Sequence, residues 1–230
     1  MKYKHIFFDL DRTLWDFDKS SLEAFAEIYE LHKLKGRGVE SVEQFHKKYT
    51  VHNEKLWDQY RKGTLSKEDL RGRRFYLTLK EFGIDDSELA ENLGMDYIRL
   101  SPLKNNLFPQ AINILEYLYP KFELHIITNG FQEVQDIKIE ASNLGRYFKT
   151  IVTSEEAGVK KPNTGIFDYA LKKAGASASE SLMVGDDPDV DILGAQKSNM
   201  DQVLFDPNAT FVVKSATYYV VCLDEMKQFL

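Results

Sequence analysis

The sequence contains a single cysteine, Cys222, among its 230 residues. One thiol cannot form a disulfide within the chain, and it cannot build a zinc site of several thiolates. Cys222 lies in the apolar run YYVVCL, so we expect it to pack as a small buried hydrophobe rather than to act as a nucleophile. Such sparing use of cysteine is typical of a reducing compartment, and we predict a cytoplasmic protein.

Long apolar runs and an excess of basic charge are also missing. No stretch approaches the roughly 18 apolar residues that a membrane span needs. The apolar stretch near the amino terminus is interrupted by Asp9 and is too short for a signal peptide. With 30 Lys and Arg against 36 Asp and Glu, the net charge is −6, which argues against nucleic acid or an anionic membrane as a partner. We therefore expect a monomer or homodimer that handles a small anion locally, through a metal or a few placed donors.

Several widespread ligand-binding motifs are absent as well. The sequence has no P-loop, no G-x-G-x-x-G dinucleotide fingerprint and no G-x-S-x-G nucleophile elbow. An EF-hand loop starting at Asp187 would require glycine at Ile192 and glutamate at Ser198, so the acidic run DPDVD is not a calcium loop of that kind.

Short apolar runs that stop abruptly at polar residues give the fold class. They are HIFFDLD, LHIITNG, TIVTSEE, LMVGDDPD and VLFDPN. Continuous runs are typical of strands buried on both faces of a parallel sheet. Helical stretches between them are predicted at Pro109–Tyr119, Gln132–Ser142, Gly165–Ala174 and Ile192–Ser198. This alternation predicts an α/β fold with a doubly wound parallel sheet.

Residues 18–103 follow a different pattern. Apolar residues recur there at helical spacing, with no strand pattern, and the segment is far longer than an ordinary loop. Gly63 and Gly83 punctuate the helices, and Ser66 begins SKED, which resembles a capping box. We predict an all-helical domain over residues 18–103, inserted into an α/β core domain formed by residues 1–17 and 104–230.

Polar side chains follow the predicted strands, where each strand ends. They are Asp9, Asp11, Thr128, Asn129, Ser154, Glu155, Asp186 and Asp187, with Lys160 and Lys161 shortly after the third pair. In open α/β sheets, ligands bind beyond the carboxyl ends of the strands. A single aspartate could simply cap a helix, which suits Asp187 or Asp189, but capping explains the whole set poorly. Carboxylates gathered with hydroxyls and a lysine favour a site for a hard metal ion.

Four motifs in this order resemble those of the haloacid dehalogenase-like hydrolases. DLDRT resembles the first motif, D-x-D-x-T, and IITNG resembles the second. GVKKPNTGIF resembles the lysine motif, and VGDDPDVDILGA resembles the fourth. The residues that carry these matches are Asp9, Asp11, Thr13, Thr128, Lys161, Asp186 and Asp191. The helical insertion falls where that family has a cap domain, so the resemblance covers nearly the whole chain and implies a Rossmann-like core with a helical cap.

The resemblance implies a role for each acid. Asp9 would be the nucleophile that forms an aspartyl-phosphate, and Asp11 would protonate the leaving oxygen and then activate water. Mg²⁺ would be held by Asp9, the backbone carbonyl of Asp11 and Asp186. Two neighbouring carboxylates then need different protonation states, which their mutual repulsion favours.

The remaining motif residues would surround these three acids. The phosphate-binding residues implied by the resemblance are Thr128, the Asn129 amide, Gly130 and Lys161. Supporting roles, orienting Lys161 or metal-bound water, fall to Thr13, Asp187 and Asp191. Because Pro162 favours extended geometry before it, we expect Lys160 to point away from Lys161 into solvent.

Two positions depart from the family pattern. Arg12 stands where the family usually has glycine, facing either the substrate entrance or solvent. Asn199 stands where a glycine often ends the helix of the fourth motif, and asparagine tolerates the left-handed conformation.

The second acid of the first motif indicates the reaction class. Haloacid dehalogenases lack it, so Asp11 argues for phosphate chemistry, and the closer resemblance is to pyrimidine nucleoside monophosphate 5′-nucleotidases. That resemblance is carried by DLDRTLWDF, NEKLWDQYRKG, IITNGF and SEEAGVKKPNTGIFDYAL. Trp15, Trp57 and Tyr60 would either stack on a base or pack the cap. Arg73 and Arg74 would either attract a phosphate or solvate a helix.

The sequence predicts a Mg²⁺-dependent phosphomonoester hydrolase, with a 5′-nucleotidase as the favoured member. A sugar-phosphate phosphatase or phosphomutase of the same family is the alternative, because both keep the two acids. A phosphorelay receiver also gathers acids, a hydroxyl and a lysine, but its middle strand ends in an aspartate. Here that strand ends in Thr128 and Asn129, which disfavours a receiver.

Overall fold

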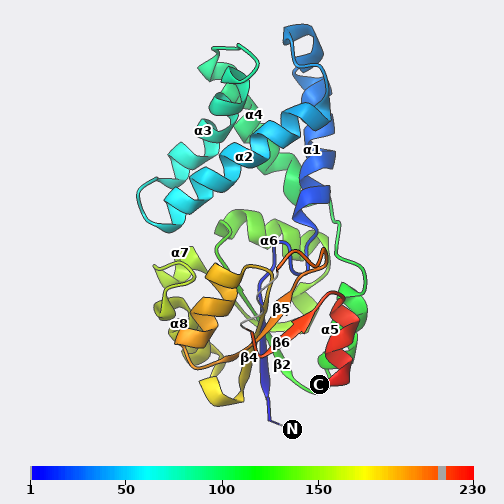
Figure 1. The fold of residues 1–230 in the computed structure, drawn as a ribbon, viewed down its shortest axis with the longest axis vertical. Coiled ribbons are helices and arrows are strands. Elements are labelled where there is room, and N and C mark those ends of the chain that lie inside the picture. The colour runs from blue at the N-terminus through cyan, green and yellow to red at the C-terminus, as the bar shows by residue number, and fades with distance from the viewer. Residues whose placement is uncertain (1, 212–215) are drawn as a thin grey trace. The chain divides into compact units, whose positions relative to one another are not determined.

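The computed structural model describes residues 2–211 and 216–230. The chain divides into two compact units: Met1–Phe17 together with Asn105–Leu230, and Asp18–Lys104. Figure 1 traces the chain through both units. Within the described residues, no helix combines the length and apolar character that crossing a membrane requires.

The first unit is built on a six-stranded sheet with the order β3-β2-β1-β4-β5-β6. Every pairing in it is parallel. The strands are β1 His5–Phe8, β2 Glu123–Thr128, β3 Phe148–Thr153, β4 Ser181–Gly185, β5 Asp201–Phe205 and β6 Tyr218–Val220. The predicted doubly wound parallel sheet is therefore confirmed. The short edge strand β6 was not predicted, and Cys222, just beyond it, is half-buried rather than fully buried.

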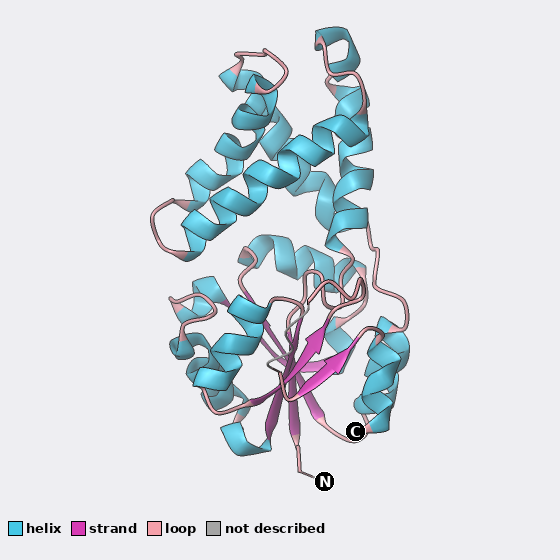
Figure 2. Cartoon of the chain, in the orientation of Figure 1, coloured by secondary structure: helices cyan, strands magenta, loops and turns pink. Residues whose placement is uncertain are grey.

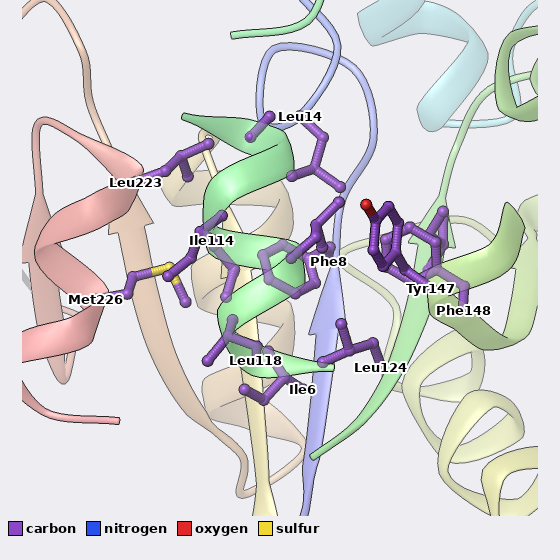
Figure 3. Packing of buried hydrophobic residues seen from close by; sticks show 14 of the residues in the cluster. Ile6, Phe8, Leu14, Ile114, Leu118, Leu124, Tyr147, Phe148, Leu223 and Met226 are labelled. Atoms are coloured by element: carbon purple, nitrogen blue, oxygen red, sulfur yellow. The ribbon is translucent and has the colours of Figure 1, made fainter. Parts of the chain in front are cut away.

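Helices cover both faces of this sheet (Figure 2). They are α5 Ala111–Leu118, α6 Gln132–Ala141, α7 Ser154–Ala157, α8 Thr164–Ala174 and α9 Leu193–Lys197. Alternate residues of β1 point to opposite faces, so Ile6 and Phe8 join one apolar core and Phe7 joins another. In Figure 3, Ile6 and Phe8 lie close to Ile114 and Leu118 of α5. Both cores fix the position of β1, the strand that leads into Asp9.

The second unit is all helical. Its helices are α1 Phe17–Leu31, α2 Val42–Arg61, α3 Lys67–Lys80 and α4 Ser87–Leu100. They pack around Phe25, whose ring lies within 6 Å of the rings of Phe45, Tyr49, Phe75 and Tyr97. The predicted helix ends are confirmed at Gly63 and Gly83, which have φ of 73° and 75°. The predicted cap is confirmed at Ser66, whose hydroxyl accepts from the Asp69 N–H at 3.0 Å. The unit thus has a core of its own, separate from the sheet.

Candidate active site

Asp9 and Lys161 form the centre of the site at the carboxyl edge of the sheet. Asp9 directly follows β1, and its carboxylate lies 2.5 Å from the Lys161 ammonium. The same ammonium donates to Asp191 at 2.7 Å and to the Ile127 carbonyl at 2.8 Å. An ammonium has three hydrogens, so these three bonds use all of them. Burial opposes the charge of Lys161, but Asp191 and Asp9 outweigh it and raise its pKa.

Asn129 fixes the backbone that carries this lysine. Its side-chain amide donates to the Lys161 carbonyl at 3.0 Å and accepts from the Lys161 N–H at 2.9 Å. Asn129 follows β2, whereas Lys161 lies 32 residues later in the chain. The side chain of Asn129, which was expected to bind phosphate, therefore serves to position Lys161.

Three carboxylates meet beside Lys161. One oxygen from each of Asp9, Asp186 and Asp191 lies within 4.8 Å of the other two. Thr13 donates its hydroxyl to Asp186 at 3.3 Å. Burial raises the pKa of Asp9 to about 7, although Lys161 pulls it down. Burial, together with repulsion from Asp191 and Asp9, also raises the pKa of Asp186 well above its usual range.

Three carboxylates face one ammonium, so when all three are ionised the pocket carries more negative charge than Lys161 neutralises. A divalent cation with oxygen ligands fits such a donor set, and Mg²⁺ is of that class. Lys161 occupies one oxygen of Asp9 and one of Asp191, and the Asp187 N–H donates to the second oxygen of Asp191 at 3.2 Å. Asp9 and Asp186 are therefore better placed than Asp191 to act as ligands. The acidic cluster is therefore able to hold a metal ion.

Asp11 is held apart from that cluster by a separate network. Its carboxylate accepts from Gln135 at 2.9 Å and from Lys138 at 2.5 Å. Both donors are buried on one face of α6, three residues apart. Sequence reasoning missed this pair. The available signal was that α6 starts directly after the polar end of β2, which places its early residues at the site.

Thr128 joins the same network. Its hydroxyl accepts from Gln135 at 2.7 Å and from the Gly130 N–H at 3.1 Å. A Cβ at Gly130 would lie only 2.2 Å from the Gln135 side-chain nitrogen. Gly130 is therefore required for Gln135 to reach Thr128 and Asp11 together.

Asp187 caps the turn that presents Asp191. Its carboxylate accepts from the N–H groups of Asp189 at 2.9 Å and Val190 at 3.1 Å, which opens the π-helical turn Pro188–Ile192. Gly185 makes room for Asp191, because a Cβ at Gly185 would lie 2.4 Å from the Asp191 Cβ. The capping role considered for Asp187 is therefore the one observed.

Arg12 and Asn199, the two residues that stand where the family usually has glycine, share a backbone conformation. Arg12 has φ of 63° and Asn199 has φ of 57°, both in the left-handed region that glycine usually occupies. The Arg12 guanidinium lies 5.1 Å from the centre of the Phe17 ring. Its charge pulls the pKa of Asp186 down, but burial outweighs that effect.

Several aromatic and basic residues take packing roles. Trp15 is fully buried in the core of the sheet unit, and Tyr60 is buried beside the half-buried Trp57. Arg74 neither solvates a helix nor lies open to a phosphate, contrary to both expectations. It is 4% exposed, donates to Asn53 at 3.0 Å and lies over the Tyr97 ring. Arg73 is exposed, and Lys160 is half-buried rather than fully solvated.

Comparison with known proteins gives the family of the chain and finds relatives of the same fold. The family model for hydrolases described as haloacid dehalogenase-like matches residues 3–199. The pyrimidine 5′-nucleotidase YjjG of Escherichia coli is 35% identical over 84% of this chain and 82% of its own. The pyrimidine 5′-nucleotidase PynA of Streptococcus pneumoniae is 28% identical over 98% of this chain and 97% of its own. Among solved structures, the magnesium-bound HAD-hydrolase YfnB of Bacillus subtilis superimposes with a TM-score of 0.88 at 26% identity, covering 99% of this chain and 98% of that one.

Proposed function

The chain belongs to the haloacid dehalogenase-like hydrolases and is a phosphatase of that family, and on this premise we propose that it is a Mg²⁺-dependent 5′-nucleotidase for pyrimidine ribo- and deoxyribonucleoside monophosphates. The observation that carries the proposal is the separation of two acids at one strand end. Asp9 is paired with Lys161, whereas Asp11 is bound by Gln135 and Lys138.

Asp9 is the nucleophile in this proposal. One of its oxygens forms a bond to phosphorus, and the bond from phosphorus to the ester oxygen breaks, which leaves an aspartyl-phosphate. The attack requires an ionised carboxylate. Lys161 favours that form through its charge, against the burial that raises the pKa of Asp9 to about 7.

Asp11 moves the protons. It gives a proton to the departing ester oxygen and later takes one from the water that cleaves the intermediate. Gln135 and Lys138 hold its carboxylate on an independent network, so Asp11 keeps its orientation while Asp9 reacts. In this proposal the two carboxylates that follow β1 have different roles: Asp9 attacks phosphorus, and Asp11 carries protons.

The metal would be held by the carboxylates of Asp9 and Asp186 with the backbone carbonyl of Asp11, and Thr13 steadies Asp186. When bound, Mg²⁺ would neutralise charge on the phosphoryl group and hold it in line with Asp9. We assign it from the oxygen-only donor set and from the raised pKa values of Asp9 and Asp186.

Phosphate oxygens would be bound at the end of β2, by the Thr128 hydroxyl and the backbone N–H of Asn129. The Gly130 N–H would join them on releasing the Thr128 hydroxyl, to which it donates at 3.1 Å. Lys161 contributes mainly through its charge, because its three hydrogens are already used by protein acceptors. A direct bond from Lys161 to phosphate would require one of those three bonds to open.

We assign substrate choice to the helical domain of residues 18–103, which carries NEKLWDQYRKG. Two relatives named as pyrimidine 5′-nucleotidases, one of them 35% identical, support a pyrimidine nucleotide as substrate. The proposal also includes a cytoplasmic enzyme that works as a monomer or homodimer.

The test is a hydrolysis panel of UMP, dTMP, purine nucleotides and hexose phosphates, each with Mg²⁺ and with a chelator. We expect release of phosphate from UMP and dTMP to exceed release from the sugars, and to stop when the metal is removed. Preference for hexose phosphates would assign a sugar-phosphate phosphatase, and isomerisation without phosphate release would assign a mutase. Phosphorylation from a donor, without turnover of any ester, would indicate a receiver.

A further inference from the structure

A second cluster of potential metal ligands lies at the opposite edge of the sheet, where β1 and β2 begin. His5 pairs in register with Glu123, and His125 lies two residues further along β2. Side chains two residues apart on a strand face the same side, so Glu123 and His125 share a face. Asp9 lies four residues beyond His5, about 13 Å along the strand direction, so this cluster is separate from the candidate active site.

The ligand atoms of the three side chains converge. Nδ1 of His5 lies 3.2 Å from Nε2 of His125 and 3.4 Å from a carboxylate oxygen of Glu123. One such atom from each of the three residues lies within 4.8 Å of the other two. A tetrahedral zinc ion with bonds of about 2.0–2.1 Å requires its ligand atoms to be roughly 3.3–3.4 Å apart. Both separations, 3.2 Å and 3.4 Å, are close to that spacing.

The chemical state of the cluster suits a metal. Burial lowers the pKa of His125 to about 4, so its imidazole is neutral at pH 7, the form that ligates metals. His125 is fully buried, but the Glu123 side chain is 43% exposed, so solvent and an ion reach the cluster from that side. The hydrogen bond between the two imidazoles joins Nδ1 of His5 and Nε2 of His125, the same nitrogens that would ligate the ion, so a bound metal would replace it.

We propose that His5, Glu123 and His125 form a binding site for a divalent transition metal of the zinc class, with water completing the coordination. Two imidazoles and one carboxylate suit Zn²⁺, whereas Mg²⁺ prefers oxygen ligands alone. The ion links the first residues of two neighbouring strands, β1 and β2. Because it binds only the folded chain in this arrangement, it raises thermal stability.

Two features of the surroundings set the expected strength. Within residues 2–211 and 216–230, Nδ1 of His125 is buried without a hydrogen-bond partner, so the ring lacks the acceptor that usually supports a ligating histidine. Loss of such support typically weakens metal affinity by about 10–100-fold. Lys149, at 2.7 Å, also competes with the ion for Glu123. We therefore expect weaker binding than at closed structural zinc sites.

The test is equilibrium dialysis of the full chain against Zn²⁺, with millimolar Mg²⁺ present to occupy the carboxylate pocket. The variants are His5→Gln and Glu123→Gln, both at the partly exposed side of the cluster. The matched control is His52→Gln, because His52 lies 3.4 Å from Glu81 and, in the part of the chain that the structure describes, this pair belongs to no group of three potential metal ligands. Asp186→Asn serves to reveal zinc that binds the carboxylate pocket instead. Circular dichroism and Mg²⁺-dependent hydrolysis of a phosphate ester verify that His5→Gln is folded.

We expect wild type, His52→Gln and Asp186→Asn each to retain one Zn²⁺ per chain in the presence of Mg²⁺. His5→Gln and Glu123→Gln should bind it at least about tenfold more weakly. Co²⁺ should give visible d–d absorption of a four-coordinate site in wild type and lose it in His5→Gln. Equal zinc binding by wild type and His5→Gln would overturn the proposal, as would zinc that disappears in Asp186→Asn or no retained zinc at all. In that last case His5 and His125 form only a hydrogen bond.

Discussion

At one edge of the sheet β1 and β2 lead into Asp9 and Asn129, which bind Lys161; at the other edge the same two strands begin with His5 and Glu123. Both edges bury titratable groups, and burial disfavours charge in each case. It raises the pKa of Asp9 and lowers the pKa of His125. The carboxyl edge gathers three carboxylates around one buried ammonium, whereas the amino edge consists of two imidazole rings beside one half-exposed carboxylate.

On the two proposals made above, one sheet would separate two kinds of metal chemistry. Oxygen ligands under strong negative charge favour a hard ion, and imidazole nitrogens favour a borderline one. The two clusters of potential metal ligands lie on the same strands but have no side chain in common. Substitutions at one edge should therefore leave the other edge unaffected.

The largest expected effect is the loss of turnover in Asp9→Asn. An amide cannot attack phosphorus, so kcat/KM should fall by at least about 10³-fold while the fold is retained. The measurement is steady-state hydrolysis of a phosphate ester alongside circular dichroism. His5→Gln, a similarly conservative change at the other end of β1, should keep wild-type turnover. Activity of Asp9→Asn near that of wild type would remove the covalent step.

The next effect is on stability, through the cation of the carboxyl edge. Lys161→Met leaves Asp9 and Asp191 buried without their shared partner, and we expect the free energy of unfolding to fall by about 3–5 kcal/mol. Urea denaturation of the metal-free protein measures this fall. The neighbouring Lys160→Met is the control and should cost less than about 1 kcal/mol. Equal losses in the two variants would mean that the buried ion pairs contribute nothing specific.

A smaller effect distinguishes the two edges of the sheet. In protein freed of metal by a chelator, the free energy of unfolding should change with pH in opposite directions for the two. The folded pKa of His125 lies near 4, below the unfolded value of 6.5, so protons bind the unfolded chain more tightly. The contribution of the neutral His125 ring to the free energy of unfolding is complete above pH 6.5. Up to roughly 3 kcal/mol of it is lost as the pH falls toward 4. Asp9, with its pKa raised to about 7, has the opposite slope and loses stability as pH rises from 4 to 7.

Denaturation curves across pH 4–8 test these signs one residue at a time. Replacing His125 by asparagine should reduce the loss on the acid side, to which His5 also contributes. Asp9→Asn should reduce the loss on the neutral side, to which Asp186 also contributes. If either variant keeps the pH dependence of wild type, the group assigned to that slope is wrong.

The smallest effect concerns the close approach at the end of β4. An alanine Cβ at Gly185 would overlap Asp191, so we expect Gly185→Ala to cost about 1–3 kcal/mol and to lower turnover by displacing the partner of Lys161. Gly145→Ala is the control, because its nearest neighbour, an Ile139 methyl, would lie at 3.4 Å. Thermal melting and kcat/KM are the readouts. Unchanged values in Gly185→Ala would show that Asp191 has room to move.

The sheet was predictable because strands buried on both faces leave continuous apolar runs, as in HIFF and LMVG. The short β6 opens the apolar run YYVVCL but was missed, because only three residues of that run pair with the sheet and two of them are half-buried. The gathering of Asp9, Lys161 and Asp186 followed from the rule that parallel strands present their carboxyl ends together. The catalytic roles of these residues remain predictions.

What the sequence did not reveal depends on side chains meeting across distant elements. Gln135 and Lys138 bind Asp11 from a helix 124 and 127 residues away along the chain, and nothing in a lone glutamine or lysine indicates such a partner. His5 and His125 carry no motif, and they meet only because β1 and β2 pair in one particular register. The burial of Arg74 was equally hidden, because a charged residue on a helix is ordinarily a solvated one.

The saturated ammonium of Lys161 has a consequence for how the enzyme responds to its environment. A cation whose every hydrogen is bound inside the protein, and whose pKa is raised by Asp191 and Asp9, stays charged across the neutral pH range. It therefore acts as a permanent counter-ion, and changes in solution acidity reach the reaction only through the carboxylates around it.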